Sequence, residues 1–256
     1  MFDDGAAYEQ MMGRWSALVA RPFLDWLQLP AGLDWLDAGC GDGSFTRVLV
    51  EAQMPRSVTG VDPAPAQLAF ARQRAATATV RFVEGDAQAL PMEDRCVDAA
   101  VMALVLFFLP DPLLGVREMV RVCRPGGLVA AYHWDLAGGG LPLQPILDAV
   151  RRQGHDSPMP QSAWASSLTA SAGLWQDAGL TDVQTCAFEV RRRFDDFEAY
   201  WRSALGSPRL RQLSASLDAG QLREARERVM QQLQASSDGH VEVTARANAV
   251  KGRTPA

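Results

Sequence analysis

The residues best suited to chemistry are three glycines and an aspartate that follow two short apolar runs. The segment LDAGCGDG at 36–43 places Gly39, Gly41 and Gly43 at alternate positions after the first run. Glycines there let the backbone turn tightly and approach a ligand closely. Asp62 ends the second run, SVTGVD, 23 residues after Gly39. An acid at that point can accept hydrogen bonds from both hydroxyls of a ribose, so the combination indicates a site for an adenosine-type cofactor.

A third acid, Asp86, follows another apolar run in VEGDAQALP. Its carboxylate could accept a hydrogen bond from the exocyclic amine of an adenine. The dinucleotide fingerprint G-x-G-x-x-G would place the third glycine one position later than Gly43, and Asp42 adds a negative charge inside the loop. A phosphate cradle is therefore disfavoured. An NAD(P)-dependent oxidoreductase on a similar fold stays an alternative, although the only lysine, Lys251, leaves no Tyr-x-x-x-Lys pair.

The elements that must position these residues alternate between strand and helix from 33 to 134. Short apolar runs that end in Gly or Asp are separated by helical stretches at 45–53, 65–76 and 112–123. This rhythm is typical of a parallel sheet covered by helices on both faces. We therefore expect an α/β fold with a doubly wound, mostly parallel sheet, in which the glycine loop, Asp62 and Asp86 meet at one edge.

The rest of the chain divides around this core. Residues 1–30 predict an N-terminal helical leader or lid, made of a helix over 8–19 and a second one over 22–29. The further divisions that we expect are a cofactor-binding core at 31–136, an insertion contributing to a substrate cap at 137–165, a core helix and strand at 166–193, a helical cap insertion at 194–238 with breaks near 206–208 and Gly220, and a final strand and tail at 239–256.

Composition and charge exclude several classes of function. The 256 residues carry 25 Lys and Arg against 30 Asp and Glu, for a formal net charge of −5, so no net positive field favours nucleic acid. Four scattered cysteines without a CxxC pair, no signal-peptide pattern and no apolar run long enough to span a bilayer predict a cytoplasmic protein with reduced thiols. Three scattered histidines leave no spacing for a metal site.

Taken together, these motifs resemble the class I S-adenosylmethionine-dependent methyltransferases, most closely the group that contains the ubiquinone and menaquinone methyltransferases. The resemblance is strongest over 33–134. It implies a seven-stranded sheet of order 3-2-1-4-5-7-6 with strand 7 antiparallel, and VEVTARANAV at 241–250 suits that strand. It also implies S-adenosyl-L-methionine as cofactor and S-adenosyl-L-homocysteine as product.

The resemblance further implies which residues bind the cofactor. The methionine half would be wrapped by Asp37, Gly39 and Gly41, and the ribose would be held by Asp62 with Pro63 and Leu68 beside it. The adenine would be read by Asp86 and Ala87, and the amino end would meet backbone groups of Met102 and Ala103. In the leader segment YEQMMGRWS, Arg14 could pair with the cofactor carboxylate, and Tyr8 or Trp15 could cover the sulfonium. The alternative is that Trp15 packs in the core and Arg14 is solvated.

His133, in AYHWD, is the candidate general base, with Asp135 and Tyr132 as weaker alternatives. The competing interpretation is a strand-end histidine whose ring bonds to a backbone carbonyl. Related enzymes often carry a polar residue where this chain has Phe107.

The run Arg191-Arg192-Arg193 could bind an anionic substrate or be a solvated strand end, and alternation in a strand would direct Arg192 to the opposite face from its neighbours.

The expected function is methyl transfer by in-line displacement to a small-molecule acceptor, whose O, C or N atom the sequence leaves open. The alternatives are the oxidoreductase above and a catalytically silent cofactor-binding partner protein. We expect no nucleic-acid partner, no membrane span and no metal, and a monomer or homodimer.

Overall fold

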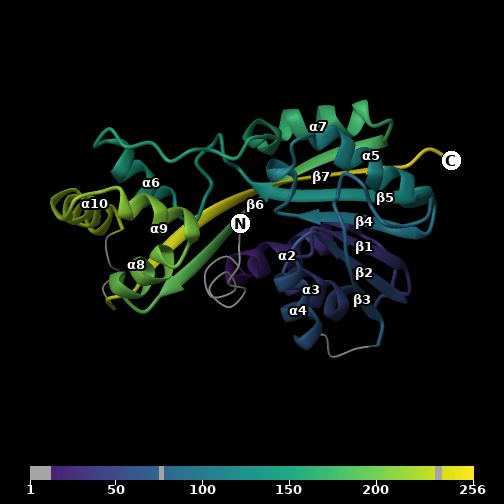
Figure 1. Ribbon diagram of the computed structural model, residues 1–256, viewed down its shortest axis with the longest axis horizontal. Helices are drawn as coiled ribbons and strands as arrows, with labels where there is room; N and C mark the ends of the chain where they lie inside the picture. Colours follow the sequence, from purple (N-terminus) through teal and green to yellow (C-terminus); the bar gives the residue numbers. More distant parts are fainter. Residues whose placement is uncertain (1–12, 75–77, 234–237) are drawn as a thin grey trace.

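Seven strands form one sheet in the order β3-β2-β1-β4-β5-β7-β6, with β7 antiparallel to both of its neighbours (Figure 1). The expected α/β fold, strand order and antiparallel β7 are thus confirmed. The computed structural model describes residues 13–74, 78–233 and 238–256. Its strands are β1 (Asp34–Ala38), β2 (Ser57–Asp62), β3 (Val80–Glu84), β4 (Val97–Ala103), β5 (Cys123–Trp134), β6 (Thr181–Phe194) and β7 (Val241–Arg253).

Helices cover both faces of the sheet. One face carries α2 (Arg14–Leu27), α3 (Ser44–Gln53) and α4 (Pro65–Arg74), and the other carries α5 (Pro112–Val122) and α7 (Leu168–Asp177) (Figure 1). Because the central strands are covered on both sides, β1, β2 and β4 are buried along nearly their whole length. This accounts for their continuous apolar runs, since a strand exposed on one face would alternate.

The N-terminal region differs from the two helices that we expected. From Arg14 to Leu27 a single helix, α2, continues through Pro22. Proline removes one helical hydrogen bond, but Val19, Ala20, Phe23 and Leu24 on either side of it are completely buried. Packing of this apolar face outweighs the lost bond. Residues 1–12, which include the first half of the expected 8–19 helix, lie outside the described residues.

Strands β6 and β7 extend past the core and carry a smaller lobe, seen on the left of Figure 1. Pairing of β5 with β7 ends at Trp134 and Ala247, whereas pairing of β6 with β7 continues to Phe194 and Val241. The lobe, as we use the term, consists of α6 (Gln144–Arg151), α8 (Phe197–Leu205), α9 (Pro208–Ala215) and α10 (Ala219–Gln232). Two short 3-10 helices, η2 (Leu106–Phe108) and η3 (Ala163–Ser166), lie nearer the core.

The expected breaks near 206–208 and Gly220 are confirmed, the second lying between Ala215 and Ala219. Asp218 caps α10 by accepting hydrogen bonds from the backbone N–H groups of Gly220 and Gln221, and the Gln221 side chain returns to the Asp218 backbone. This reciprocal capping box starts the helix at Ala219 and outweighs the poor helix propensity of glycine.

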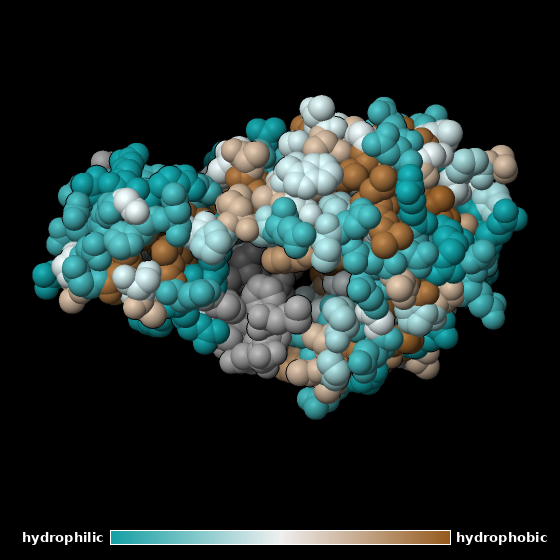
Figure 2. Space-filling model, turned by 45° about the horizontal axis from the view of Figure 1, so that its top comes forward, coloured by the Kyte–Doolittle hydropathy of each residue, from teal (hydrophilic) through white to brown (hydrophobic). Residues whose placement is uncertain are grey.

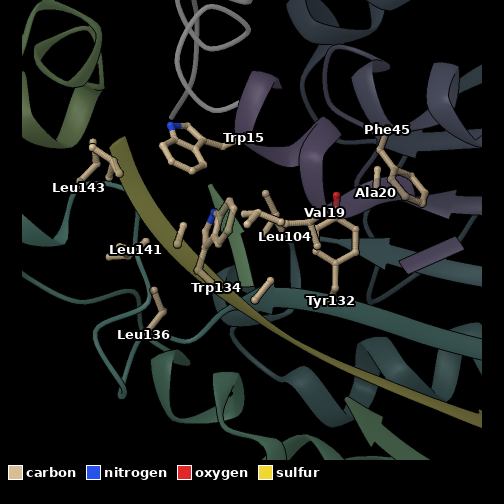
Figure 3. Packing of buried hydrophobic residues seen from close by; sticks show 14 of the residues in the cluster. Trp15, Val19, Ala20, Phe45, Leu104, Tyr132, Trp134, Leu136, Leu141 and Leu143 are labelled. Carbon is tan, nitrogen blue, oxygen red and sulfur yellow. The ribbon is translucent and has the colours of Figure 1, made fainter. Parts of the chain in front are cut away.

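One hydrophobic core joins the main sheet to the lobe. Trp15, Tyr132 and Trp134 lie between α2 and β5, and Leu136, Leu141 and Leu143 continue the core toward the lobe (Figure 3). The molecule narrows between its two parts, and the outer surface of the lobe is mostly hydrophilic (Figure 2). None of the described helices combines the length and the apolar character that a membrane crossing requires.

Candidate functional site

The glycine loop joins β1 to α3 and is built from residues that need an unusual backbone. Gly39, Gly41 and Gly43 have positive φ values of 79°, 52° and 76°, a region that side chains rarely tolerate. A Cβ on Gly39 would overlap the side chain of Val105. The loop therefore lies close against the segment after β4 and presents bare backbone at the carboxyl ends of the strands, where open α/β sheets bind ligands.

Asp62, at the end of β2, ties this loop in place. One carboxylate oxygen accepts the backbone N–H of Gly41 at 2.9 Å, and the other accepts that of Ala64 at 2.9 Å. Each oxygen keeps a second lone pair, so the carboxylate can still accept two hydroxyl groups. Burial raises the pKa of Asp62, with the negative charge of Asp42 contributing.

Asp37 lies below the loop on β1 and is completely buried. Its Oδ2 accepts a hydrogen bond from the hydroxyl of Thr46 at 2.6 Å, and Oδ1 has no partner among the described residues. Burial, reinforced by the charges of Asp62 and Asp42, raises the pKa of Asp37 to about 7. Three carboxyl groups, those of Asp37, Asp42 and Asp62, thus lie in or beneath one loop, with Arg74 3.9 Å from Asp42. A cationic ligand would relieve their repulsion further, whereas a polyphosphate would increase it.

The residues expected around the ribose and adenine follow β2, β3 and β4. Pro63 is exposed, and Leu68 is completely buried on α4. Asp86 is exposed and accepts the backbone N–H of Gln88 at 2.8 Å, while Ala87 is buried beside it. Met102 is completely buried, and Ala103 is half-buried at the end of β4. Their backbones share the sheet edge of the glycine loop, and their contact with a cofactor remains a prediction.

Helix α2 begins at the same edge. The hydroxyls of Ser16 and Tyr132 are 2.7 Å apart, and the ring of Tyr132 packs 5.8 Å from that of Phe45, in the first turn of α3. Arg14 is exposed, whereas Trp15 is buried, with its ring 6.4 Å from that of Phe194. In this conformation the indole of Trp15 is a packing group (Figure 3). Tyr8 lies outside the described residues.

His133 is on the face of β5 opposite Tyr132 and is completely buried. Neither ring nitrogen has a hydrogen-bond partner among the described residues, so the backbone carbonyl that we considered as its partner is absent there. Burial lowers the pKa of His133 to about 4, which keeps the ring neutral near pH 7. Its cross-strand neighbour is Asn248, whose amide Nδ2 donates to the carbonyl of Ser166 at 2.9 Å.

The two weaker base candidates have structural partners. Asp135 accepts the backbone N–H of Gly138 at 3.0 Å and lies 3.6 Å from Arg246, while Tyr132 bonds to Ser16. Phe107 is buried, so no polar side chain stands at that position. Sequence reasoning missed Thr46 and Val105. Thr46 was recognisable in principle as a hydroxyl in the first turn of the helix after the loop.

Comparisons with known proteins show similarity to methyltransferases over this part of the chain. Residues 36–131 match a family model described as a methyltransferase domain. The chain is 39% identical to malonyl-(acyl-carrier protein) O-methyltransferase of Pectobacterium atrosepticum over 111 residues. This stretch makes up 43% of the chain and 42% of that protein. The chain is also 38% identical to demethylmenaquinone methyltransferase of Staphylococcus aureus over 104 residues. This stretch makes up 40% of the chain and 43% of that protein. The chain therefore spans about two-fifths of the length of these curated relatives.

Solved structures share the fold over a longer stretch. The crystal structure of a putative methyltransferase from an antibiotic biosynthesis pathway of Anabaena variabilis superimposes with a TM-score of 0.63. The superposition covers 91% of this chain and 98% of that one, at 17% sequence identity. At that identity the likeness shows the fold alone, and it extends beyond the segment that the sequence relatives cover.

Proposed function

We propose that this chain, whose residues 36–131 form a class I S-adenosylmethionine-dependent methyltransferase domain, transfers a methyl group from that cofactor to a small-molecule acceptor. The observation that carries the proposal is the loop of three positive-φ glycines tied by Asp62 at the end of β2. Bare backbone, an acid with free lone pairs and a cluster of buried carboxyl groups match a cofactor that combines a ribose with a cationic centre.

The residues present fit the cofactor, because nothing lies within 4 Å of the position that a Cβ would take at Gly41, so the loop is open there. In our proposal the loop and Asp37 bind the methionine half, Asp62 with Pro63 and Leu68 binds the ribose, and Asp86 with Ala87 binds the adenine. The backbone of Met102 and Ala103 would meet the amino end, and exposed Arg14 would pair with the carboxylate.

Bound S-adenosylmethionine supplies an activated methyl group. The protein's own contribution is to align the acceptor and to exclude water, which can contribute about 7 to 11 kcal/mol for well-oriented reactants. The apolar core between α2, β5 and the lobe borders the same edge, so we assign the acceptor site to the region where these elements meet. Proton removal by His133 would require its buried ring to become accessible.

Calorimetric titration tests the proposal directly. Micromolar binding of S-adenosylmethionine and S-adenosylhomocysteine without binding of NAD is the expected result. Binding of NAD alone would favour an oxidoreductase and overturn the proposal. A screen of labelled methyl transfer onto fractionated metabolites then separates an enzyme from a silent cofactor-binding protein, because only the enzyme labels a fraction.

A further inference from the structure

The charged side chain of Arg192, on strand β6, is partly buried and has no acidic partner among the described residues. Its Nη1 is shielded from solvent and has no hydrogen-bond partner among the described residues. The guanidinium lies over the ring of Phe194, with Cζ 4.4 Å from the ring centroid. Arginine stays charged inside proteins, and buried polar groups are normally hydrogen-bonded. An unsatisfied guanidinium donor of this kind therefore needs a physical explanation.

The flanking arginines show what Arg192 lacks. Arg191 pairs with Glu189 at 3.0 Å and with Glu242 at 3.4 Å, and Arg193 pairs with Asp238. Both lie on the exposed face of β6, whereas Val190 and Phe194, which share the face of Arg192, are buried in the core. The outer face of this strand thus supplies a carboxylate to each arginine, and the inner face supplies none among the described residues.

A second cation lies beside Arg192. Helix α2 and strand β6 run in opposite directions, as two ring contacts show. The ring centroids of Trp26 and Phe188 are 6.2 Å apart near the end of the helix, and those of Trp15 and Phe194 are 6.4 Å apart near its start. This alignment places the first turn of α2, with Arg14, next to Arg192. Burial, with a smaller contribution from the charge of Arg14, lowers the pKa of Arg192. Arg14 has no carboxylate partner among the described residues either, so within the part of the chain that the structure describes, two arginines lie at this corner without an acidic group beside them.

This corner is linked by direct contacts to the glycine loop. Phe45, just after the loop, packs against Tyr132, and the Tyr132 hydroxyl meets Ser16 in the first turn of α2. Trp15 in the same turn packs against Phe194, over which Arg192 lies. Arg192 is therefore at the end of α2 nearest the loop, on the side toward the lobe. A molecule held between the loop and the lobe would come within reach of its guanidinium.

We propose that Arg192 binds an anionic group, a carboxylate or a phosphate, carried by the methyl acceptor. This inference rests on the proposed function, in which Arg14 serves the carboxylate of the cofactor. A planar guanidinium donates two parallel hydrogen bonds to either anion, so an acid or phosphate ester fits the unpartnered Nη1 better than a neutral acceptor does. Phe194 beneath the guanidinium fixes its plane and leaves the opposite face for the apolar part of the acceptor.

The test uses inorganic phosphate and malonate as probes on the full chain, with and without saturating S-adenosylhomocysteine. Thermal shift is measured at constant ionic strength, with chloride as the reference anion, because a general salt effect would act on any variant. We compare the wild type with Arg192→Gln and Arg192→Lys. Arg191→Gln is the matched control, since it removes the neighbouring charge on the opposite face of the same strand.

We expect a saturable stabilisation by one or both probes in the wild type and in Arg191→Gln, with a midpoint at least about tenfold higher in Arg192→Gln. Arg192→Lys should fall between them, because it keeps the charge and loses the planar fork. A larger response to malonate assigns a carboxylate, and a larger response to phosphate assigns a phosphate ester. Equal responses in the wild type and in Arg192→Gln would overturn the proposal.

Titration of S-adenosylhomocysteine into the same proteins separates this inference from the proposed function. We expect Arg192→Gln to bind it as the wild type does. If Arg192→Gln weakens this binding and phosphate displaces the ligand, Arg192 serves the cofactor and the inference is wrong. If the wild type binds no S-adenosylhomocysteine, the proposed function fails, while the probes on the free protein still decide whether Arg192 binds anions.

Discussion

The carboxylate of Asp62 accepts the backbone N–H of Gly41 at 2.9 Å, so the acid that ends β2 also fixes the loop that follows β1. A second oxygen of the same group accepts the N–H of Ala64. One side chain thus serves both as the proposed ribose ligand and as the support of the glycine loop. Changes at Asp62 should therefore affect cofactor binding twice, through the lost ligand and through the loosened loop.

For Asp62→Asn we expect at least about a tenfold loss of affinity for S-adenosylhomocysteine, because an amide has one acceptor oxygen where the two N–H groups need two. The free energy of unfolding should fall by about 1 to 3 kcal/mol. Titration calorimetry and urea denaturation measure the two effects. Unchanged affinity in Asp62→Asn would remove Asp62 from the site.

Replacement of Gly39 by alanine tests the close approach of the loop to the segment after β4. Gly39→Ala would combine a strained φ of 79° with overlap against Val105. Gly32→Ala is a matched control, since Gly32 has a φ of 80° with nothing within 4 Å of the added Cβ. We expect the control to lose about 1 to 2 kcal/mol of stability and Gly39→Ala to lose about 1 to 3 kcal/mol more. Equal losses in denaturation would contradict the packing argument.

Cofactor binding should release a proton from Asp37. The folded pKa, at about 7, lies above the ordinary value of 3.8, so the contribution to stability is complete below pH 4 and is lost as the pH rises through 7. A bound cation nearby favours the carboxylate. Affinity for S-adenosylmethionine should thus rise with pH between about 6 and 8.

Calorimetry in buffers of different ionisation enthalpy would detect this release. The apparent binding enthalpy should depend on the buffer in the wild type and should no longer do so in Asp37→Asn, which has no proton to release. Thr46→Val is a useful companion, because loss of the 2.6 Å hydrogen bond to the carboxylate should shift the transition to higher pH. Identical enthalpies in all buffers for the wild type would refute the prediction.

His133 should make the protein less stable in acid. Its folded pKa, about 4, lies below the ordinary value of 6.5, so its contribution is complete above pH 6.5 and is lost as the pH falls to 4. The loss amounts to roughly 3 kcal/mol. The difference in unfolding free energy between the wild type and His133→Leu should change over this pH range. Both proteins contain Asp37, so its contribution cancels in the difference. A flat difference would contradict it, and full turnover in the variant would exclude His133 as a base.

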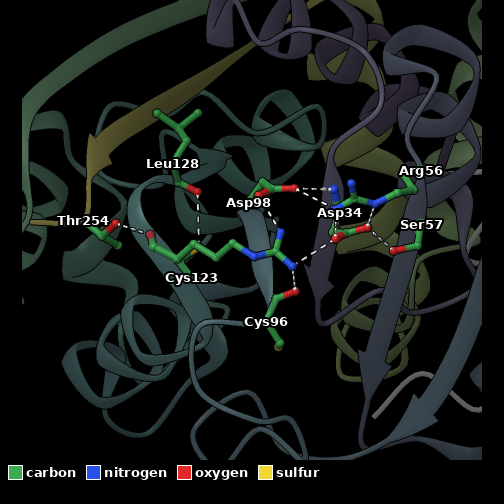
Figure 4. A network of polar contacts seen from close by, with 9 residues as sticks. Asp34, Arg56, Ser57, Cys96, Asp98, Cys123, Leu128 and Thr254 are labelled. Carbon is green, nitrogen blue, oxygen red and sulfur yellow. Dashed lines mark hydrogen bonds and ion pairs between the residues drawn. The ribbon is translucent and has the colours of Figure 1, made fainter. Parts of the chain in front are cut away.

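Substitutions at the amino ends of the strands, opposite the glycine loop, should lower stability and leave ligand binding unchanged. Arg124, at the start of β5, pairs with Asp98 at 2.5 Å and with Asp34 at 3.1 Å, and donates to the carbonyl of Cys96 (Figure 4). Arg56 joins the same network through Asp34. Because Arg124 is 38% exposed, solvent screening reduces the effect, and Arg124→Gln should cost about 1 to 2 kcal/mol. A changed affinity for S-adenosylhomocysteine would show coupling between the edges.

Much of the fold and of the proposed cofactor site was predictable because the relevant signals are local. The loop at 39–43 and Asp62 follow apolar runs directly, and the ends of parallel strands meet at one edge whatever the intervening helices do. The continuity of α2 through Pro22 was not predictable in this way. Local propensity stops a helix at proline, and only burial against the sheet restores it.

Whether a single polar residue is paired or buried depends on segments that are remote in sequence, and this was not predictable. Strand alternation predicted that Arg192 faces away from its two neighbours, but their partners Glu242 and Asp238 lie 51 and 45 residues further along the chain. The burial of His133 likewise depends on the sheet and the helices around it, including β7 with Asn248. No periodicity in the sequence reports which charges remain unpaired after folding.

The pairing of β6 with β7, which is regular from Gln184 to Phe194, has a mechanical consequence. Domains joined by a flexible linker move relative to each other at small energetic cost, whereas bending this ladder would strain the backbone hydrogen bonds between Gln184 and Phe194 of β6 and the facing residues of β7. The lobe is thereby held at a set angle to the sheet. Different acceptors would then be accommodated by exchange of side chains on a rigid frame, and not by reorientation of the lobe.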